Sequence, residues 1–175
     1  MKTFLIAFSI FFAATSLQIH AQTIKQMTTE QRADEHYKAG LAAARKMQPD
    51  TSAALYHFSQ AITLNPRHAP AAKWLSWVHE QMHNDVQALY HISRYLSLEQ
   101  GDAKAYFRRA VILIRLNRYT EAFADFSEAV RLAENETDKG VFLEYRANLF
   151  DTLAAADRRL LNNLQQQRTI QQEGR

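Results

Sequence analysis

Cysteine is absent from this chain of 175 residues. That absence excludes structural disulfides, thiolate zinc sites, iron–sulfur clusters, catalytic thiols and cysteine-linked lipid anchors. A stable fold must therefore come from the burial of apolar side chains. The chain has the material for it, because 47% of its residues are apolar and its aromatic residues include ten Phe and seven Tyr.

Glycine and proline are scarce, with four and three residues respectively. So few turn formers disfavour a sandwich or barrel of many short strands and favour helices. A large charge of one sign is also lacking, since 21 Lys and Arg face 18 Asp and Glu, a formal charge of +3. Nucleic-acid binding is therefore not expected, because it draws on a dense positive surface.

The N-terminus carries the features of an export signal. Lys2 precedes an apolar run of eleven residues, FLIAFSIFFAA, and Ile19, His20 and Ala21 before Gln22 fit a cleavage site that ends in a small residue. At 1.5 Å per residue this run is shorter than the roughly 30 Å hydrocarbon core of a membrane. We therefore expect a signal peptide over residues 1–21 that is cleaved before a linker at 22–27. The mature chain is then exported, to a periplasm or outside the cell, without a stable membrane anchor.

Alanines recur along the chain at a spacing of 34 residues. Each is followed four residues later by a large apolar residue and three residues after that by a third member of the row. Positions four and three apart lie on one face of a helix, and the small members let a neighbouring helix approach closely. The three rows are Ala54, Phe58 and Ala61; Ala88, Ile92 and Tyr95; and Ala122, Phe126 and Ala129.

A second helical pattern precedes each row, so the repeating unit is a pair of helices. Gly40 lies fourteen residues before its alanine, whereas Ser76 and Ala110 lie twelve before theirs. This difference predicts a two-residue insertion in the first turn, within residues 48–51. Thr28 and Gln31 have the spacing of a capping box. Three further side chains are suited to start helices, namely Asp50, Asn84 and Asp102.

The segment AKAYFRRAVILIRLNRYTEAFADFSEAVRLAEN resembles the tetratricopeptide repeat family. Repeats are expected over about 33–66, 69–100 and 103–135, followed by an amphipathic capping helix at about 137–167 within a domain spanning 28–167. Residues 168–175 are predicted to be a frayed polar tail. The resemblance implies an all-α fold, a right-handed superhelix of three helix-turn-helix repeats. Its packing positions are expected at Gly40, Ala54, Phe58, Ala61, Leu75, Ala88, Ile92, Ala110, Ala122, Phe126 and Ala129.

The resemblance also implies a function. The first helices of such repeats line a concave groove, which suits a peptide or protein partner with acidic or apolar anchors. We expect no catalysis and no cofactor. Self-assembly through the terminal helices, giving a structural homo-oligomer of a cell-envelope complex, is the alternative. The groove is expected to contain Tyr37, Lys73, Trp77, Lys104, Phe107, Arg108, Val111, Arg115 and Tyr145.

Some members of the family hold a partner's C-terminal carboxylate with a clamp of Lys, Asn and Arg. Lys104 and Arg108 match its basic pair, but Tyr37, Leu41 and Trp74 stand at its other positions. A receptor for chaperone tails is therefore not expected.

The segment from His79 to His83, HEQMH, matches the zinc motif H-E-x-x-H. A zinc hydrolase also needs a third protein ligand and a substrate cleft. The next candidates, His91 and Glu99, do not have the spacing of the longer motif. His79 stands where the repeat places an aromatic ring, so the segment is expected to finish the first helix of the middle repeat. A zinc-dependent hydrolase remains the least favoured hypothesis, with His79 and His83 as weak candidate ligands.

Overall fold

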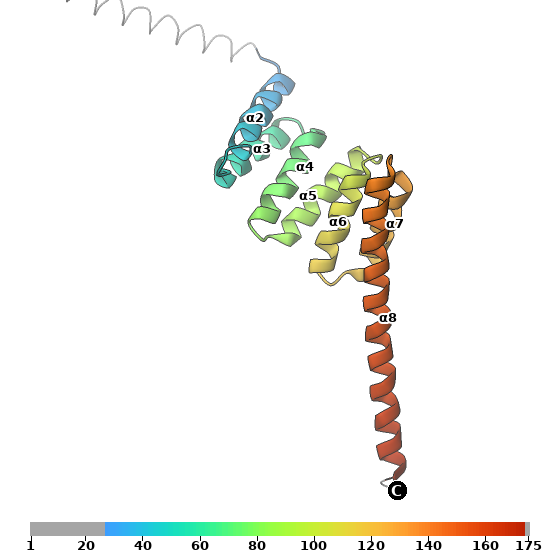
Figure 1. Cartoon of the computed structure of the whole chain (residues 1–175). Coiled ribbons are helices and arrows are strands. Elements are labelled where there is room, and N and C mark those ends of the chain that lie inside the picture. Colours follow the sequence, from blue (N-terminus) through green and yellow to red (C-terminus); the bar gives the residue numbers. More distant parts are fainter. Residues whose placement is uncertain (1–26, 174–175) are drawn as a thin grey trace, which may run out of the picture. The chain divides into compact units, whose positions relative to one another are not determined.

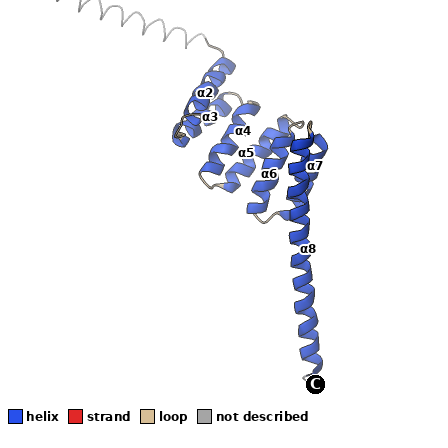
Figure 2. Cartoon of the chain, in the orientation of Figure 1, coloured by secondary structure: helices blue, strands red, loops and turns tan. Residues whose placement is uncertain are grey.

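The structure is a computed structural model that describes residues 27–173, and this part of the chain contains seven α-helices and no strand (Figures 1 and 2). The predicted signal peptide and residues 22–26 of the linker lie outside the described residues. Among the helices that are described, none has the length and apolar content needed to cross a membrane. The helices are α2 (Thr29–Ala44), α3 (Thr51–Leu64), α4 (Ala69–Gln81), α5 (Asp85–Leu98), α6 (Ala103–Arg115), α7 (Tyr119–Leu132) and α8 (Glu136–Glu173).

The helices belong to two compact units, which divide between Met82 and His83. The first unit holds α2, α3 and α4, and the second holds α5, α6, α7 and α8. Within each unit, helices that follow one another in sequence pack together, as in α2 with α3 and α6 with α7.

Four of the described helices begin at residues whose side chains cap the first turn, as the sequence predicts. Thr28 and Gln31 form the predicted capping box: the Gln31 amide donates to Thr28 Oγ1 at 3.2 Å, and the Thr28 amide donates to Gln31 Oε1 at 2.9 Å. The side chains of Asp50, Asn84 and Asp102 cap α3, α5 and α6, each by accepting from the backbone amide three residues on. These accepted bonds satisfy amides that the first helical turn leaves without partners.

Phe58 forms the centre of the core of the first unit. Its ring stacks on Trp74 of α4, with centroids 5.8 Å apart. Helix α2 approaches the same ring so closely that a Cβ added to Gly40 would lie 2.6 Å from it. The turn between α2 and α3 runs from Arg45 to Asp50, longer than the equivalent turns at Met82–Asn84 and Leu116–Arg118, and it contains the predicted insertion.

The core of the second unit is centred on Phe126 of α7, with Ala110, Leu113 and Leu149 around it. The N-terminal half of α8 packs on α7, but the helix continues well past its neighbours (Figure 1). Every described side chain from 155 to 168 is exposed. The helix also extends beyond the predicted cap at about 137–167, because residues 168–173, expected in a frayed tail, are helical.

The side chains at the expected packing positions are buried in the structure, as is Gly40. Tyr95 occupies a position where the family usually has a small residue, and it too is buried. Its hydroxyl donates to Asp102 Oδ2 at 2.8 Å. Burial and this acceptor raise the pKa of the Tyr95 hydroxyl, so the phenol stays protonated. The larger side chain is accommodated because its polar end has a partner.

Candidate functional site

Four of the expected groove residues form one stripe along α6. Lys104, Arg108, Val111 and Arg115 follow one another at spacings of four, three and four residues, which places them on one face of the helix. Lys104 and Arg115 are exposed, whereas Arg108 and Val111 are half-buried. We call these four residues the α6 stripe. It presents three cations and one apolar side chain.

Carboxylates from neighbouring helices hold the two ends of the α6 stripe. Lys104 Nζ lies 3.2 Å from Asp138 Oδ2 in the first turn of α8. Arg115 donates from Nε to Asp85 Oδ1 at 2.8 Å, at the start of α5. Hydrogen bonds from Asn135 and Lys104 lower the pKa of the Asp138 carboxyl. Asp102 caps α6 through Oδ1 and accepts from the Tyr95 hydroxyl at Oδ2.

Phe107 comes directly before Arg108 of the α6 stripe and belongs to a cluster of four aromatic rings. Its ring stacks on Phe142 with centroids 4.8 Å apart and meets Tyr145 edge-on at 5.0 Å and Phe126 at 5.5 Å. Phe107 therefore joins α6 to α7 and α8, while the half-exposed ring of Tyr145 is the part of the cluster open to solvent. In the second unit, Tyr145 and the α6 stripe are the residues best placed to meet a partner.

In the first unit, the expected groove residues Tyr37, Lys73 and Trp77 are half-buried. The Tyr37 ring lies 4.9 Å from the His68 ring, and Tyr37 and Trp77 both pack against the Phe58 core. Leu41 and Trp74, which stand at clamp positions, also pack against this core. These aromatic residues therefore contribute to packing and keep only part of their surface for a partner.

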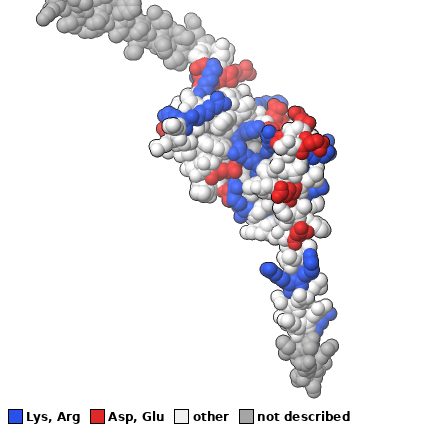
Figure 3. Space-filling model, viewed as in Figure 1, with Lys and Arg blue, Asp and Glu red and all other residues white. Residues whose placement is uncertain are grey.

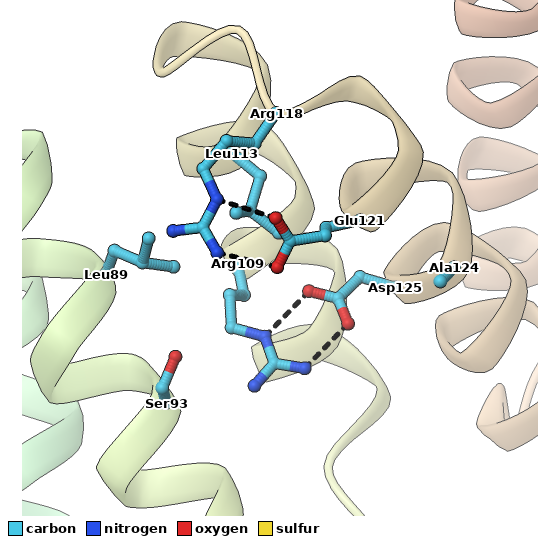
Figure 4. Close-up of a pocket in the computed structure, with 8 residues that line it drawn as sticks. All are labelled: Leu89, Ser93, Arg109, Leu113, Arg118, Glu121, Ala124 and Asp125. Carbon is cyan, nitrogen blue, oxygen red and sulfur yellow. Dashed lines mark hydrogen bonds and ion pairs between the residues drawn. The ribbon is translucent and has the colours of Figure 1, made fainter.

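A cavity of about 310 Å³ lies between α5, α6 and α7 (Figure 4). Arg109 donates from Nε and Nη2 to the two Asp125 oxygens, both at 2.7 Å. These hydrogen bonds raise the pKa of the Arg109 guanidinium. A second, exposed pair joins Arg118 to Glu121. The lining residues are Leu89, Ser93, Arg109, Leu113, Arg118, Glu121, Ala124 and Asp125.

Sequence reasoning missed the Arg109–Asp125 pair. A signal was present, because Asp125 follows the buried Ala122 by three residues and precedes Phe126, on the face that the repeat buries. A carboxylate on such a face requires a cation or several donors close by. The pair spans two helices that are already in contact, so the geometry assigns it to holding the third repeat together.

The HEQMH segment does not form a helical zinc motif. Helix α4 ends at Gln81, and His83 lies beyond it with a φ of 54°. The helix therefore ends inside the segment, two residues before its last histidine, so His79 and His83 do not belong to one continuous helix. His79 is half-buried, and burial lowers the pKa of its imidazole. No group of three or more metal-binding side chains occurs within the described part of the chain.

Comparisons with known proteins agree with this architecture. Residues 103–136 match the sequence model of the tetratricopeptide repeat. The Arabidopsis OM64 TPR domain is 26% identical, with a TM-score of 0.60 over 69% of this chain and 98% of that one. The first TPR of Spaghetti (RPAP3), bound to the HSP90 peptide SRMEEVD, is 17% identical, with a TM-score of 0.63 over 71% and 95% of the two chains.

A third similar structure is the Yersinia enterocolitica type III secretion chaperone SycD in complex with a peptide of the translocator YopD. It is 13% identical, with a TM-score of 0.59 over 71% of this chain and 93% of that one. No curated protein sequence matches the chain. The all-helical fold expected from the sequence is confirmed, and the repeat match together with the solved structures supports the tetratricopeptide repeat family for this chain.

Proposed function

We propose that the protein is a non-catalytic scaffold that binds a peptide or another protein. The observation that carries the proposal is the α6 stripe beside Tyr145. Three cations at helical spacing attract an acidic segment, and an exposed aromatic ring gives such a segment an apolar anchor. Asp138 and Asp85 fix Lys104 and Arg115 before binding, so less side-chain entropy is lost when a partner docks.

The similar structures support this proposal by analogy of fold. The RPAP3 domain holds a peptide, SRMEEVD, that contains two Glu and one Asp. The SycD chaperone holds a peptide of a translocator. A partner segment with acidic residues and at least one apolar residue fits the α6 stripe and Tyr145 in the same general way.

A labelled peptide tests this chemistry directly. We would use a ten-residue peptide of alternating Glu and Leu and a matched peptide with Gln for Glu, and follow binding by fluorescence anisotropy. The Glu peptide should bind about tenfold tighter at low salt, and the difference should shrink as the salt concentration rises. Equal affinities for the two peptides would remove the α6 stripe as the recognition surface.

The matched variants use residues outside the packed core. Lys104→Ala combined with Arg108→Ala should weaken binding of the Glu peptide about tenfold or more while leaving the helical circular dichroism intact. Arg131→Ala is the control, because Arg131 is an exposed cation of α7 paired with Glu128. Phe107 is not suited to this test, because its replacement would disrupt the four-ring cluster.

We also propose that the scaffold works in an exported compartment, periplasmic or extracellular. The support is the sequence pattern of residues 1–21, a basic start, an apolar run and a small-residue end. N-terminal sequencing of the protein recovered from expressing cells should begin near Gln22. Recovery of intact Met1 from the membrane fraction would contradict cleavage.

Self-assembly remains a second candidate role, because α8 exposes a series of large apolar side chains.

A further inference from the structure

Helix α8 borders a surface that no described part of the chain covers. A cavity of about 560 Å³ lies between α7 and α8. Phe123 of α7 and Leu143 and Phe150 of α8 are exposed at its edges, and Phe150 is 61% exposed. Arg146 and Asp151 lie beside these apolar side chains. The cavity has the composition of a helix-binding site, because apolar side chains line it together with one cation and one carboxylate.

The same helix carries a second apolar surface on its projecting half, which begins at residue 155. Leu160, Leu161 and Leu164 are 59%, 58% and 45% exposed. All three lie within about 100° of one another around the helix, since successive residues are about 100° apart. Figure 3 shows Lys and Arg side chains next to uncharged surface on this part of α8.

The two surfaces belong to one continuous stripe. Apolar residues at 143, 147, 150, 154, 161 and 164 follow spacings of three and four residues, and Asp157 is the single charged member of the series. Such spacing is that of a seam between two helices. Because the stripe runs along both halves of α8, an antiparallel copy of α8 presents the same stripe in reverse.

The distribution of charge along α8 favours one relative direction for two paired copies of this helix. Residues 136–151 contain four acidic and two basic side chains, a net charge of −2, whereas residues 152–168 contain one acidic and three basic side chains, a net charge of +2. A parallel pair would place like charges together, and an antiparallel pair places each acidic half beside a basic half. With the two-fold axis near Ala154, Asp151 of one copy lies close to Arg158 of the other.

We infer that α8 mediates an antiparallel homodimer in which the projecting half of each α8 occupies the cavity between α7 and α8 of the other copy. The contact is isologous, so the same patch serves both copies and the assembly closes at two. Leu161 and Leu164 of one copy lie over Ala147 and Leu143 of the other. The dimer does not depend on partner binding at the α6 stripe.

Sedimentation equilibrium of the protein recovered from expressing cells tests the inference. A reversible dimer is expected, and Leu161→Asp with Leu164→Asp should weaken it about a hundredfold or more. Asn163→Asp with Gln166→Asp adds the same charge to the opposite side of the same segment and should weaken the dimer far less, because it leaves the apolar contact in place. A chain that stays monomeric at 100 micromolar, the order of concentration where weak interfaces populate dimers, overturns the inference, as does a dimer that the Leu variants leave unchanged.

The absence of cysteine makes the position of the axis measurable. Ala154→Cys introduces the only thiol, and two copies related by an axis at this residue should form an intermolecular disulfide rapidly under mild oxidation. Asn163→Cys, on the opposite side of α8, should cross-link slowly. Equal rates for the two variants would contradict antiparallel pairing about Ala154, even if a dimer forms elsewhere.

Mixing two variants, each defective in one side of the proposed contact, distinguishes this reciprocal contact from any other interface. Phe150→Asp disables the cavity, and Leu161→Asp with Leu164→Asp disables the projecting half. Each variant alone should be monomeric, whereas their mixture should form a heterodimer, because one intact cavity then meets one intact projecting half. A mixture that remains as monomeric as its components would overturn the reciprocal arrangement.

Discussion

At the scale of single residues, the Arg109–Asp125 pair shows what a buried charge requires. Asp125 is 6% exposed, and two guanidinium bonds at 2.7 Å offset the loss of its hydration. The neighbouring Arg118–Glu121 pair has a similar shape but lies in solvent. The cavity of Figure 4 therefore offers a buried pair and an exposed pair for direct comparison.

Replacing Asp125 with Ala should lower the free energy of unfolding by about 3 kcal/mol, because Arg109 is left partly buried without its counter-charge. Glu121→Ala, which breaks the exposed pair, should cost less than about 1 kcal/mol. Urea unfolding followed by circular dichroism measures both. Similar losses for the two variants would show that the burial of Asp125 does not set the energy of its pair.

Replacement by alanine is expected to have opposite effects on stability at Gly40 and at Gly140. Gly40→Ala should destabilise the first unit by about 1–3 kcal/mol, because the new methyl group would meet the Phe58 ring in a packed core. Gly140→Ala should stabilise α8 by about 0.5–1 kcal/mol, because nothing lies within 4 Å and alanine favours the helix. Thermal unfolding of the two variants gives the comparison, and a stabilising Gly40→Ala would mean that α2 can move away from α3.

At the scale of the element, the α2–α3 hairpin contains a pair of histidines. His36 Nδ1 and His57 Nδ1 are 3.2 Å apart, which places a donor and an acceptor together only while at least one imidazole is neutral. Burial lowers the pKa of His36, and the charge of His57 lowers it further. Protonation of both rings would bring two positive charges together between the helices.

The hairpin should therefore lose stability in acid. A lowered pKa in the folded state means that the unfolded chain binds the proton first, so stability is complete above about pH 6.5, the ordinary histidine value, and falls as the pH drops through the pKa of folded His36. Urea midpoints at pH 8 and pH 5 measure the loss, and His36→Gln should reduce it. His79 contributes in the same direction in both proteins, so an unchanged difference in His36→Gln would assign the effect to His79.

The helices also show which features of the fold could be predicted from the sequence. The repeat register, the capping box at Thr28 and the insertion before α3 were predictable, because each depends on residues close together in the chain. His68 as the cap of α4 was not, since histidine rarely serves there. The early end of α4 was missed because His83 adopts a left-handed conformation that glycine or asparagine usually supplies; Asn117, 34 residues later, has the same conformation.

The candidate site was predictable only in part, for a physical reason. The spacing of the α6 stripe follows from one helix, so the shared face of its residues was predictable, and their role in binding stays a prediction. The partners Asp138 and Asp85 come from other helices, and the Arg109–Asp125 pair joins residues sixteen positions apart, so these contacts depend on packing. The length of α8 was underestimated because its Gln-rich end has no apolar periodicity to mark it.

At the scale of the whole molecule, the projecting half of α8 should be dispensable for folding. A chain that ends at Ala156 should keep its melting temperature within about 2 °C, because the described side chains removed are all exposed. The helical signal should fall only in proportion to the residues removed. A large drop in melting temperature at monomer concentrations would show that this segment supports the fold; calorimetry at two protein concentrations separates that effect from loss of a dimer.

The projecting half of α8 also has a kinetic consequence. Its backbone amides are protected by bonds within the helix alone, and uncovered helix opens and closes on a scale of about a microsecond. Hydrogen exchange should therefore slow progressively from the end of α8 toward Leu149, which is buried. Proteases begin where a chain opens most often, so the first cuts should fall in this overhang, and whatever covers it should slow them.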